Sequence, residues 1–323
     1  VYTINKFKRE KRLQMRRITF DIPYIKLQFI AEILENTAMP SNKVSALRGG
    51  LGEMLLQQHC IRDRNCEVCI FKKPCLFRHT FYTDMEKKPA YVTGKESVGY
   101  LIECDDVREF FEKGSKLQFN LLLFGDSIAY FNLYFQAFYQ LGMYGVGKNK
   151  SVFQIAEVRS TEGNRIIYRD RADMGEYKVF FLKDYIESRK KELRIGQEPC
   201  AMVFTSPFSM KYQKEYMKEF YGEPLVKGAA RRVQMLNYYM GQETELPEFS
   251  QYPRIIHQKI KQESIKRYSS THGSTMILRG ISGYAILQDI TEECLNYLIA
   301  GEVLHIGRNT SFGFGKYHLR VVK

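Results

Sequence analysis

The chain has 323 residues, enough for one large or two ordinary domains with cores of their own. No apolar run reaches the ~18 residues of a membrane span, and the N-terminal VYTINKFKREKR has no signal-peptide core after its basic stretch, so we expect a cytoplasmic protein without a membrane partner. The excess of 49 Lys and Arg over 36 Asp and Glu gives a net charge of +13 and favours a polyanionic partner.

The first half of the chain alternates strand and helix patterns. MRRITFDIP predicts a strand over 15–23, and SALRGGLGEMLLQQHC predicts a helix over 45–60. The elements predicted next are strands over 99–106 and 115–125, a helix over 126–145 with one apolar face, and a glycine-lysine loop that enters a strand within 145–158.

The second half shows the same plan more clearly. Its predicted elements are a strand over 198–210, a helix over 225–241, two strands within 264–289 broken at His272-Gly273, a helix over 290–304 with Thr291 at its N-cap, and a closing strand over 312–322. The order strand, helix, strand, strand, helix, strand is that of a split βαβ, or ferredoxin-like, domain.

Because both halves follow this plan, we expect an α+β fold of two tandem ferredoxin-like (RRM-like) domains with a cleft between them. The predicted boundaries are 1–160 for the N-terminal domain with a cysteine-cluster insertion, 161–197 for a connecting segment, and 198–323 for the C-terminal domain with a glycine-rich loop.

A glycine-rich, basic loop follows the second helix of each half. In GEVLHIGRNTSFGFGKY the spacing G-x5-G-x-G leaves backbone N–H groups free to converge on an anion such as phosphate. The alternative is that Gly313 and Gly315 only relieve crowding where the last strand packs on a helix. Phosphate binding is favoured because the first half repeats the chemistry with Gly145, Gly147, Lys148 and Lys150.

Four of the seven cysteines cluster as C-x5-C-x2-C-x5-C, at Cys60, Cys66, Cys69 and Cys75. In a cytosolic protein this pattern argues against disulfides. Two alternatives remain: a tetrahedral structural zinc, or four reduced cysteines that pack as small hydrophobic side chains.

The C-terminal LHIGRNTSFGFGKY, preceded by RGISGYAIL, resembles the signature of the RAMP superfamily, and in particular the CRISPR-associated endoribonucleases that cut precursor CRISPR RNA within its repeats. SALRGGLGEML followed by CEVCIFKKPCLFRHTF, and VFTSPFSM, are similar to other parts of the same family. The resemblance implies metal-independent cleavage, in which a 2′-hydroxyl attacks the phosphate and leaves a cyclic phosphate and a 5′-hydroxyl. It implies no cofactor for catalysis.

The resemblance also implies the partners of a prokaryotic, cytoplasmic protein. These are precursor CRISPR RNA and guide RNA, together with other CRISPR-associated subunits or a fused adaptation module. The main alternative is a non-catalytic RAMP subunit that binds guide RNA in an effector complex. A third hypothesis is a structural RNA-binding protein without a CRISPR role.

Cleavage of this kind needs a proton acceptor, a proton donor and cations. His305, two residues before Gly307, is the first candidate for an acid/base group; the alternative is a helix-terminal histidine that shapes the loop. Further candidates are His59, His79, Tyr144 and Lys148.

The predicted RNA contacts come from the two loops and from the basic segments KGAARR and SIKRYSS, which would otherwise be solvated faces. They are Gly145, Gly147, Lys150, Lys227, Arg231, Arg232, Lys266, Arg267, Gly307, Arg308, Asn309, Thr310, Ser311, Gly313, Gly315 and Lys316.

Overall fold

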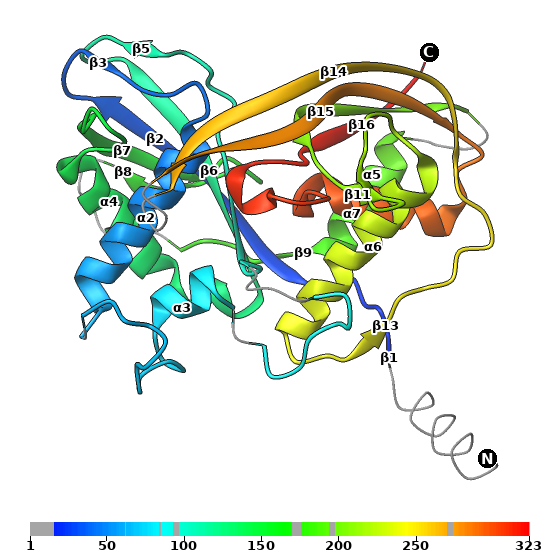
Figure 1. Cartoon of the computed structure of the whole chain (residues 1–323), viewed down its shortest axis with the longest axis horizontal. Helices are drawn as coiled ribbons and strands as arrows, with labels where there is room; N and C mark the ends of the chain where they lie inside the picture. Colours follow the sequence, from blue (N-terminus) through cyan, green and yellow to red (C-terminus); the bar gives the residue numbers. More distant parts are fainter. Residues whose placement is uncertain are drawn as a thin grey trace.

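The structure is a computed structural model, and it describes residues 16–61, 63–83, 85–92, 97–169, 176–193, 198–269 and 274–322. Two sheets, each with helices packed against it, lie beside each other along the long axis of the molecule (Figure 1). They confirm the predicted α+β fold with two ferredoxin-like domains.

The N-terminal sheet has the strand order β4-β6-β2-β7-β8, and β9 pairs with β2. The first four of these strands, taken with two helices, give the ferredoxin-like order. The bounds are β2 Pro23–Ile33, β4 Tyr100–Glu103, β6 Lys116–Phe124, β7 Phe153–Ser160, β8 Ile166–Arg169 and β9 Phe180–Phe181. A separate pair is formed by β3 Thr37–Ala38 and β5 Phe110–Phe111.

The strand predicted over 15–23 is wrong. In that stretch only the two-residue β1, Arg16–Arg17, forms within the described residues, and it pairs with β13, Thr244–Glu245. The first long strand is β2, which lies between β6 and β7. It is mostly buried on both faces, so its sequence PYIKLQFIAEI lacks the polar alternation by which a half-exposed strand is identified.

The two helices predicted in the first domain are confirmed as α2 Lys43–His59 and α4 Phe131–Tyr144. The 3₁₀ turn η1 Gly125–Tyr130 replaces the first part of the helix predicted over 126–145, and the short α3 Leu76–Phe81 was not predicted. The side chain of Asn42 caps α2 by accepting a hydrogen bond from the Ser45 N–H over 3.1 Å. A Cβ on Gly50 would lie 2.4 Å from Leu141, so glycine allows α2 and α4 to pack closely.

The C-terminal sheet has the order β14-β15-β10-β16, again that of a ferredoxin-like domain. The strands are β10 Cys200–Phe208, β14 Arg254–Ser269, β15 Ser274–Gln288 and β16 Tyr317–Val321. The helices are α6 Gly222–Tyr239 and α7 Glu292–Leu304, and Thr291 caps α7 as predicted. The remaining elements are the small hairpin of β11 Lys211–Tyr212 and β12 Glu215–Tyr216, and the 3₁₀ turn η2 Thr310–Phe312.

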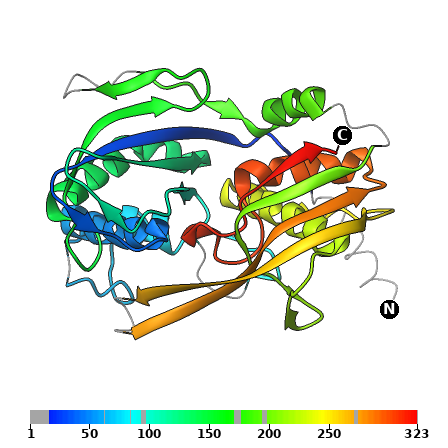
Figure 2. The ribbon, with the colours of Figure 1, turned by 90° about the horizontal axis from the view of Figure 1, so that it is seen from above.

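The hairpin of β14 and β15 is longer than predicted, because β14 begins at Arg254 and not near Ser264. The predicted break at His272-Gly273 lies outside the described residues. Figures 1 and 2 show the two strands running from the C-terminal sheet across to the first domain, where their far ends lie beside α2. The second domain therefore contributes side chains to the surface of the first.

The domains also meet through a continuous apolar core. Tyr24 and Leu122 of the first domain belong to the same buried cluster as Phe204 and Leu298 of the second. Within the predicted connecting segment 161–197, β8 joins the N-terminal sheet, whereas α5, Leu182–Leu193, packs on α7. Among the described residues, no helix combines the length and the apolar character needed to cross a membrane.

A pocket of about 490 Å³ opens at the domain junction on the α5 side. It is lined by Tyr24 and Glu162 of the first domain, by α5, and by His318 of β16. In Figure 2, α5 and the β14–β15 hairpin lie at opposite edges of the molecule. The junction therefore has two distinct sides, and the glycine-rich loop belongs to the hairpin side.

Candidate functional site

The C-terminal glycine-rich loop lies at the junction of the two domains, between α7 and β16. A Cβ on Gly313 would lie 3.0 Å from Val44, in the first turn of α2. Gly307, Gly313 and Gly315 have φ angles of 87°, 83° and 77°, in the left-handed region that favours glycine. The loop is thus packed closely against the beginning of α2.

Several N–H groups of this loop are already used within the protein. Those of Phe312 and Gly313 donate to Asn309 and Thr310, and that of Gly315 donates to Pro207 over 2.8 Å. A Cβ on Gly315 would lie 1.9 Å from the carbonyl oxygen of Ile306. For Gly315, close packing therefore accounts for the glycine, which is the alternative considered from the sequence.

The middle of the loop differs. Among the hydrogen bonds of the described residues, the N–H groups of Thr310 and Ser311 find no acceptor. Arg308 is exposed beside them, and its own N–H donates to Ser209 over 2.7 Å. Phosphate binding by Arg308, Asn309, Thr310 and Ser311 stays a prediction.

His305 does not face solvent. It is 0% exposed, and its Nε2–H donates to Oε1 of Glu103 over 3.1 Å. The other oxygen of Glu103 lies 2.8 Å from Lys26 Nζ and 3.4 Å from Lys316 Nζ. Lys316 also lies 2.8 Å from Asp105. These contacts join the loop and β16 of the second domain to the sheet of the first.

The ionisation of this cluster follows from burial and charge. Burial alone would raise the pKa of Glu103, but the hydrogen bond from His305 and the charges of Lys26 and Lys316 hold that pKa well below its ordinary value. Burial lowers the pKa of His305, although Glu103 opposes this. At neutral pH, Glu103 is therefore ionised and His305 is neutral. The proton of the neutral imidazole is on Nε2, because this atom donates to Glu103.

These contacts give His305 a structural role at the domain junction, the second alternative considered from the sequence. Its Nδ1 is buried and has no hydrogen-bond partner within the described part of the chain. Its backbone φ of 55° turns the chain from α7 into the loop. These contacts do not test the acid/base role expected for His305 from the sequence, but in this conformation RNA does not reach its ring.

Three residues that are distant in the sequence meet in front of the loop. The guanidinium carbons of Arg48 in α2 and Arg267 in β14 each lie 4.3 Å from the centroid of the Phe312 ring. Arg48 is further held by the ring of Phe81 at 4.8 Å and by the hydroxyl of Ser97 at 3.4 Å. We call Arg48, Phe312 and Arg267 the arginine–phenyl cluster.

The sequence reasoning identified Arg267 but missed Arg48, Phe312 and Glu103. Arg48 stands in the glycine-rich SALRGG, and a cation beside two glycines at a helix start is a signal that could have been used. No comparable signal marks Glu103, which stands in an apolar strand and acquires its partners by the packing of two domains.

The N-terminal loop lies elsewhere. Its Asn149 side chain donates to the Ala38 carbonyl over 2.8 Å, and Lys150 Nζ lies 3.6 Å from the centroid of the Tyr144 ring. Lys148 and Gly147 are exposed, and Gly145 is buried at the end of α4. Within the described residues, no hydrogen bond, ion pair or ring contact joins this loop to the C-terminal one.

The four clustered cysteines border one pocket of about 180 Å³, together with His59. Cys60, Cys66, Cys69 and Cys75 are free thiols of intermediate burial. Nε2 of His59 is buried and has no hydrogen-bond partner within the described part of the chain. Among the described residues, no three His, Cys, Asp or Glu side chains are already arranged around a metal position. The zinc site stays a prediction.

The remaining histidine candidate, His79, contacts the hydroxyl of Tyr239 in the second domain through its Nε2 at 2.9 Å. Burial lowers its pKa. It lies on α3, beside the rings of Tyr130 and Tyr239.

The predicted basic contacts on α6 are partly engaged in the protein. Lys227 pairs with Glu223 at 2.6 Å, and the backbone carbonyl of Arg231 accepts a hydrogen bond from Tyr91. Arg232 donates to the Leu304 carbonyl at the end of α7 over 3.1 Å. Their contacts with RNA stay predictions.

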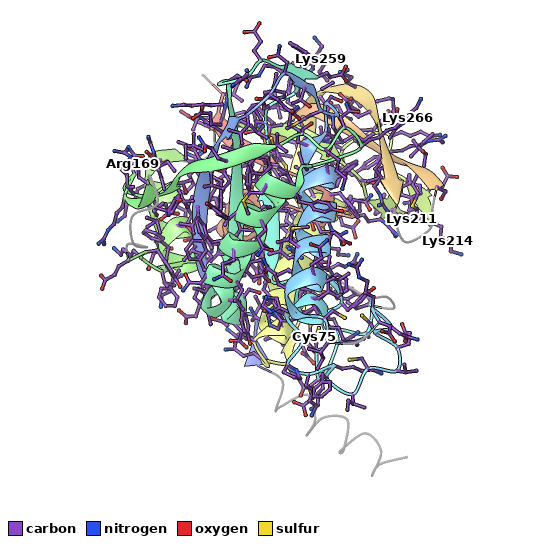
Figure 3. The ribbon with its side chains drawn as sticks, turned by 90° about the vertical axis from the view of Figure 1, so that its left-hand side faces the viewer. Cys75, Arg169, Lys211, Lys214, Lys259 and Lys266 are labelled. Carbon is purple, nitrogen blue, oxygen red and sulfur yellow. The ribbon has the colours of Figure 1, made fainter. Side chains whose placement is uncertain are left out.

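The hairpin carries the more exposed cations. Figure 3 shows Lys259 and Lys266 of the hairpin on the same side of the molecule as Lys211 and Lys214 of the β11–β12 turn, whereas Cys75 lies near the opposite end. Exposed lysines thus lie along the hairpin, and Lys266 directly precedes Arg267 of the arginine–phenyl cluster.

Two family models match the sequence. Residues 202–317 match the CRISPR-associated endoribonuclease Cas6 family, and residues 22–179 match a family described as an N-terminal domain. The boundary between the matches falls in the region of α5. No curated protein matches the sequence.

Solved structures resemble the whole fold. A chain of a partial Cas6-RT-Cas1–Cas2 complex has a TM-score of 0.59 and 13% identity; the match covers 93% of this chain and 46% of that one. A Cas6 product complex has a TM-score of 0.54 and 12% identity, with coverage of 94% and 100%. Cas6 from Thermus thermophilus has a TM-score of 0.50 and 11% identity, with coverage of 92% and 98%. The chain thus spans less than half of the first of these and nearly all of the others.

Proposed function

We propose that this chain, a CRISPR-associated protein of the Cas6 type, is an endoribonuclease that cuts precursor CRISPR RNA within its repeats and so releases guide RNAs. The observation that carries the proposal is the position of the family's glycine-rich loop. It lies at the junction of the two domains, against the first turn of α2, with the guanidinium groups of Arg48 and Arg267 over its Phe312 ring.

The proposed chemistry is attack by the 2′-hydroxyl next to the scissile phosphate. The new P–O bond gives a cyclic phosphate, and the broken P–O bond leaves a 5′-hydroxyl on the downstream product. Negative charge develops on the phosphorane oxygens, and cations held in a partly buried site stabilise it. Arg48 and Arg267 are placed to supply such charge. No metal ion is needed for the proton transfers, which we assign to protein side chains and solvent.

One observation favours the second candidate function, a non-catalytic subunit that binds guide RNA. His305 is the histidine next to the loop, and it is buried and bonded to Glu103. If cleavage required this histidine at the phosphate, the chain would bind guide RNA without cutting its precursor. The two candidate functions differ in one measurable step, the cleavage of the RNA.

The test is incubation of the purified chain with repeat RNA in excess EDTA. Cleavage at one position, with a 2′,3′-cyclic phosphate on the upstream product, is the expected result. Repeat RNAs with single 2′-deoxy substitutions are the matched controls, because one of them, at the nucleotide before the cut, should block cleavage and still bind. Tight binding of every RNA without cleavage would favour the non-catalytic subunit.

Protein partners are proposed on the same basis. Because one similar structure is described as a Cas6-RT-Cas1–Cas2 complex, we propose that this chain acts beside other CRISPR-associated subunits, including an adaptation module. Co-purification of such subunits with the tagged chain from its native host tests this proposal, and a chain recovered alone would contradict it.

A further inference from the structure

The arginine–phenyl cluster brings together two positive charges from different domains. The guanidinium carbons of Arg48 and Arg267 lie 4.3 Å from the same ring centroid, so they are at most twice that distance apart. That upper limit is about one Debye length at physiological salt, so the two charges repel each other without being fully screened. Attraction to the ring stabilises each cation, but the ring carries no net charge and does not neutralise the pair.

Neither guanidinium is matched by an acid. Arg48 and Arg267 form no ion pair with a carboxylate within the described part of the chain, and the Nε of each is buried without a hydrogen-bond partner there. Burial, followed by the charge of Arg48, lowers the pKa of Arg267. Two other cations of the hairpin are paired: Arg254 with Asp289 at 2.6 Å, and Lys261 with Glu263 at 2.9 Å.

The polar groups that these side chains do contact are weak partners. Arg267 donates to the thioether sulfur of Met276 over 3.2 Å, and Arg48 donates to the Ser97 hydroxyl over 3.4 Å. Two guanidinium groups over one ring, neither paired with a carboxylate in the described part of the chain, fit an anion with several oxygens, since a phosphate accepts paired hydrogen bonds from guanidinium groups.

We propose that Arg48 and Arg267 jointly bind one phosphodiester of single-stranded RNA, and that Phe312 holds the two guanidinium groups apart at the spacing that this phosphate bridges. The proposal rests on the proposed function. It adds to that function the place where one phosphate of the RNA contacts both the hairpin and α2. Nucleic acid is favoured over an acidic peptide because Arg267 directly follows the exposed Lys266 in β14, and because Phe312 belongs to the loop of a domain that matches the Cas6 family.

The test measures binding of an oligouridylate of roughly 12 nucleotides to Arg48→Gln, Arg267→Gln and the double variant. Each single change should weaken binding about tenfold, the effect of losing a charged hydrogen bond. The double variant should be little weaker than either single variant, because both side chains hold one phosphate. In each single variant the slope of log K against log salt should become shallower by about 0.7, the value for one phosphate contact. The double variant should show the same change and not twice that change.

Lys259→Gln is the matched control, because Lys259 is an exposed cation of the same hairpin outside the cluster. Its effect should add to that of Arg48→Gln. Arg48→Lys and Arg267→Lys keep the positive charge but lose the paired N–H donors of the guanidinium group. Their affinities for the oligouridylate should therefore lie between those of wild type and the Gln variants. Unfolding curves confirm that each variant is folded, and the Lys variants replace any Gln variant that is not.

Additive losses for Arg48 and Arg267 would overturn the proposal, as would full affinity in both single variants. The proposal would also be overturned if a polyglutamate peptide bound as tightly as the oligouridylate and the double variant bound that peptide as well as the single variants did. That result would assign the site to an acidic protein partner. Because oligouridylate binding does not depend on cleavage, coupled arginines in a chain that does not cut repeat RNA would refute the proposed function alone. Cutting with uncoupled arginines would refute this inference alone.

Discussion

At the scale of single residues, the junction depends on His305 and its contact with Glu103. A histidine selected from the sequence for its closeness to the glycine-rich loop lies inside the protein, where burial keeps it neutral and Glu103 accepts its Nε2–H. Its neighbour Lys316, predicted to touch RNA, is also mostly buried and pairs with Glu103 and Asp105. Both residues hold the loop on the first domain.

We therefore predict that folded His305→Ala cleaves repeat RNA at a single-turnover rate within about tenfold of wild type at saturating RNA. A general acid or base contributes about 10²–10⁴ to the rate, so a loss of that size with unchanged affinity would identify His305 as the acid/base group. Single-turnover rate and affinity are measured on the same preparation. Glu103→Gln serves as the control, because it removes the charge that His305 contacts and weakens the junction while the imidazole itself is kept.

The same pair predicts a dependence of stability on pH. Because burial lowers the pKa of His305 in the folded state, the unfolded chain takes up its proton first, and stability falls as pH drops below about 6.5. Glu103 contributes in the same direction only near and below its ordinary range, because its folded pKa is depressed.

Between pH 7 and pH 5, the free energy of unfolding of wild type should therefore fall more than that of His305→Gln. His79, whose pKa is also lowered by burial, contributes equally to both proteins and cancels in the comparison. Chemical denaturation at the two pH values gives the measurement. Parallel pH profiles would show that the His305 side chain keeps its ordinary pKa.

At the scale of elements, α7, the loop and β16 show what a sequence can and cannot reveal. Helical periodicity and the Thr291 cap located α7, and the glycine spacing located the loop, because these signals are local. The strand β2 escaped because both of its faces are buried, which removes the alternation that identifies a strand. The partners of Arg48 and Glu103 escaped because they come from the other domain.

Substitutions of two glycines test whether close packing and a positive φ require glycine in the loop. Gly315→Ala should lower the free energy of unfolding by about 2 kcal/mol or more, because its φ is 77° and the new Cβ would lie 1.9 Å from the Ile306 carbonyl oxygen. Gly49→Ala, in α2 with nothing within 4 Å of its Cβ, should raise stability by about 0.5–1 kcal/mol. Urea denaturation checks both, and equal effects would contradict the account.

The cysteine segment carries a further prediction. All four thiols border one pocket and are only half-buried, which disfavours packing as core residues; we propose that they bind one structural zinc after the segment closes around it. Elemental analysis should find about one zinc per chain. Cys66→Ser and Cys69→Ser should lose it, and Cys104→Ser, outside the segment, should keep it. A metal-free wild type with unchanged stability would support four reduced thiols.

At the scale of the whole molecule, the tandem ferredoxin-like plan followed from the order of predicted elements, and the net charge of +13 pointed to a polyanion. Neither could show that β14 and β15 extend across to α2, because the length of a hairpin and its contact with another domain depend on packing between distant segments. That extension makes the proposed RNA surface a product of both domains.

The most direct test of this account is photo-crosslinking of 4-thiouridine-substituted repeat RNA to the chain, with the crosslinked peptides identified by mass spectrometry. The account predicts crosslinks in three segments that meet at one side of the junction: the start of α2, the β14–β15 hairpin and the loop from Gly307 to Lys316. Crosslinks confined to the opposite side, around α5 and the pocket lined by Tyr24 and His318, would contradict it.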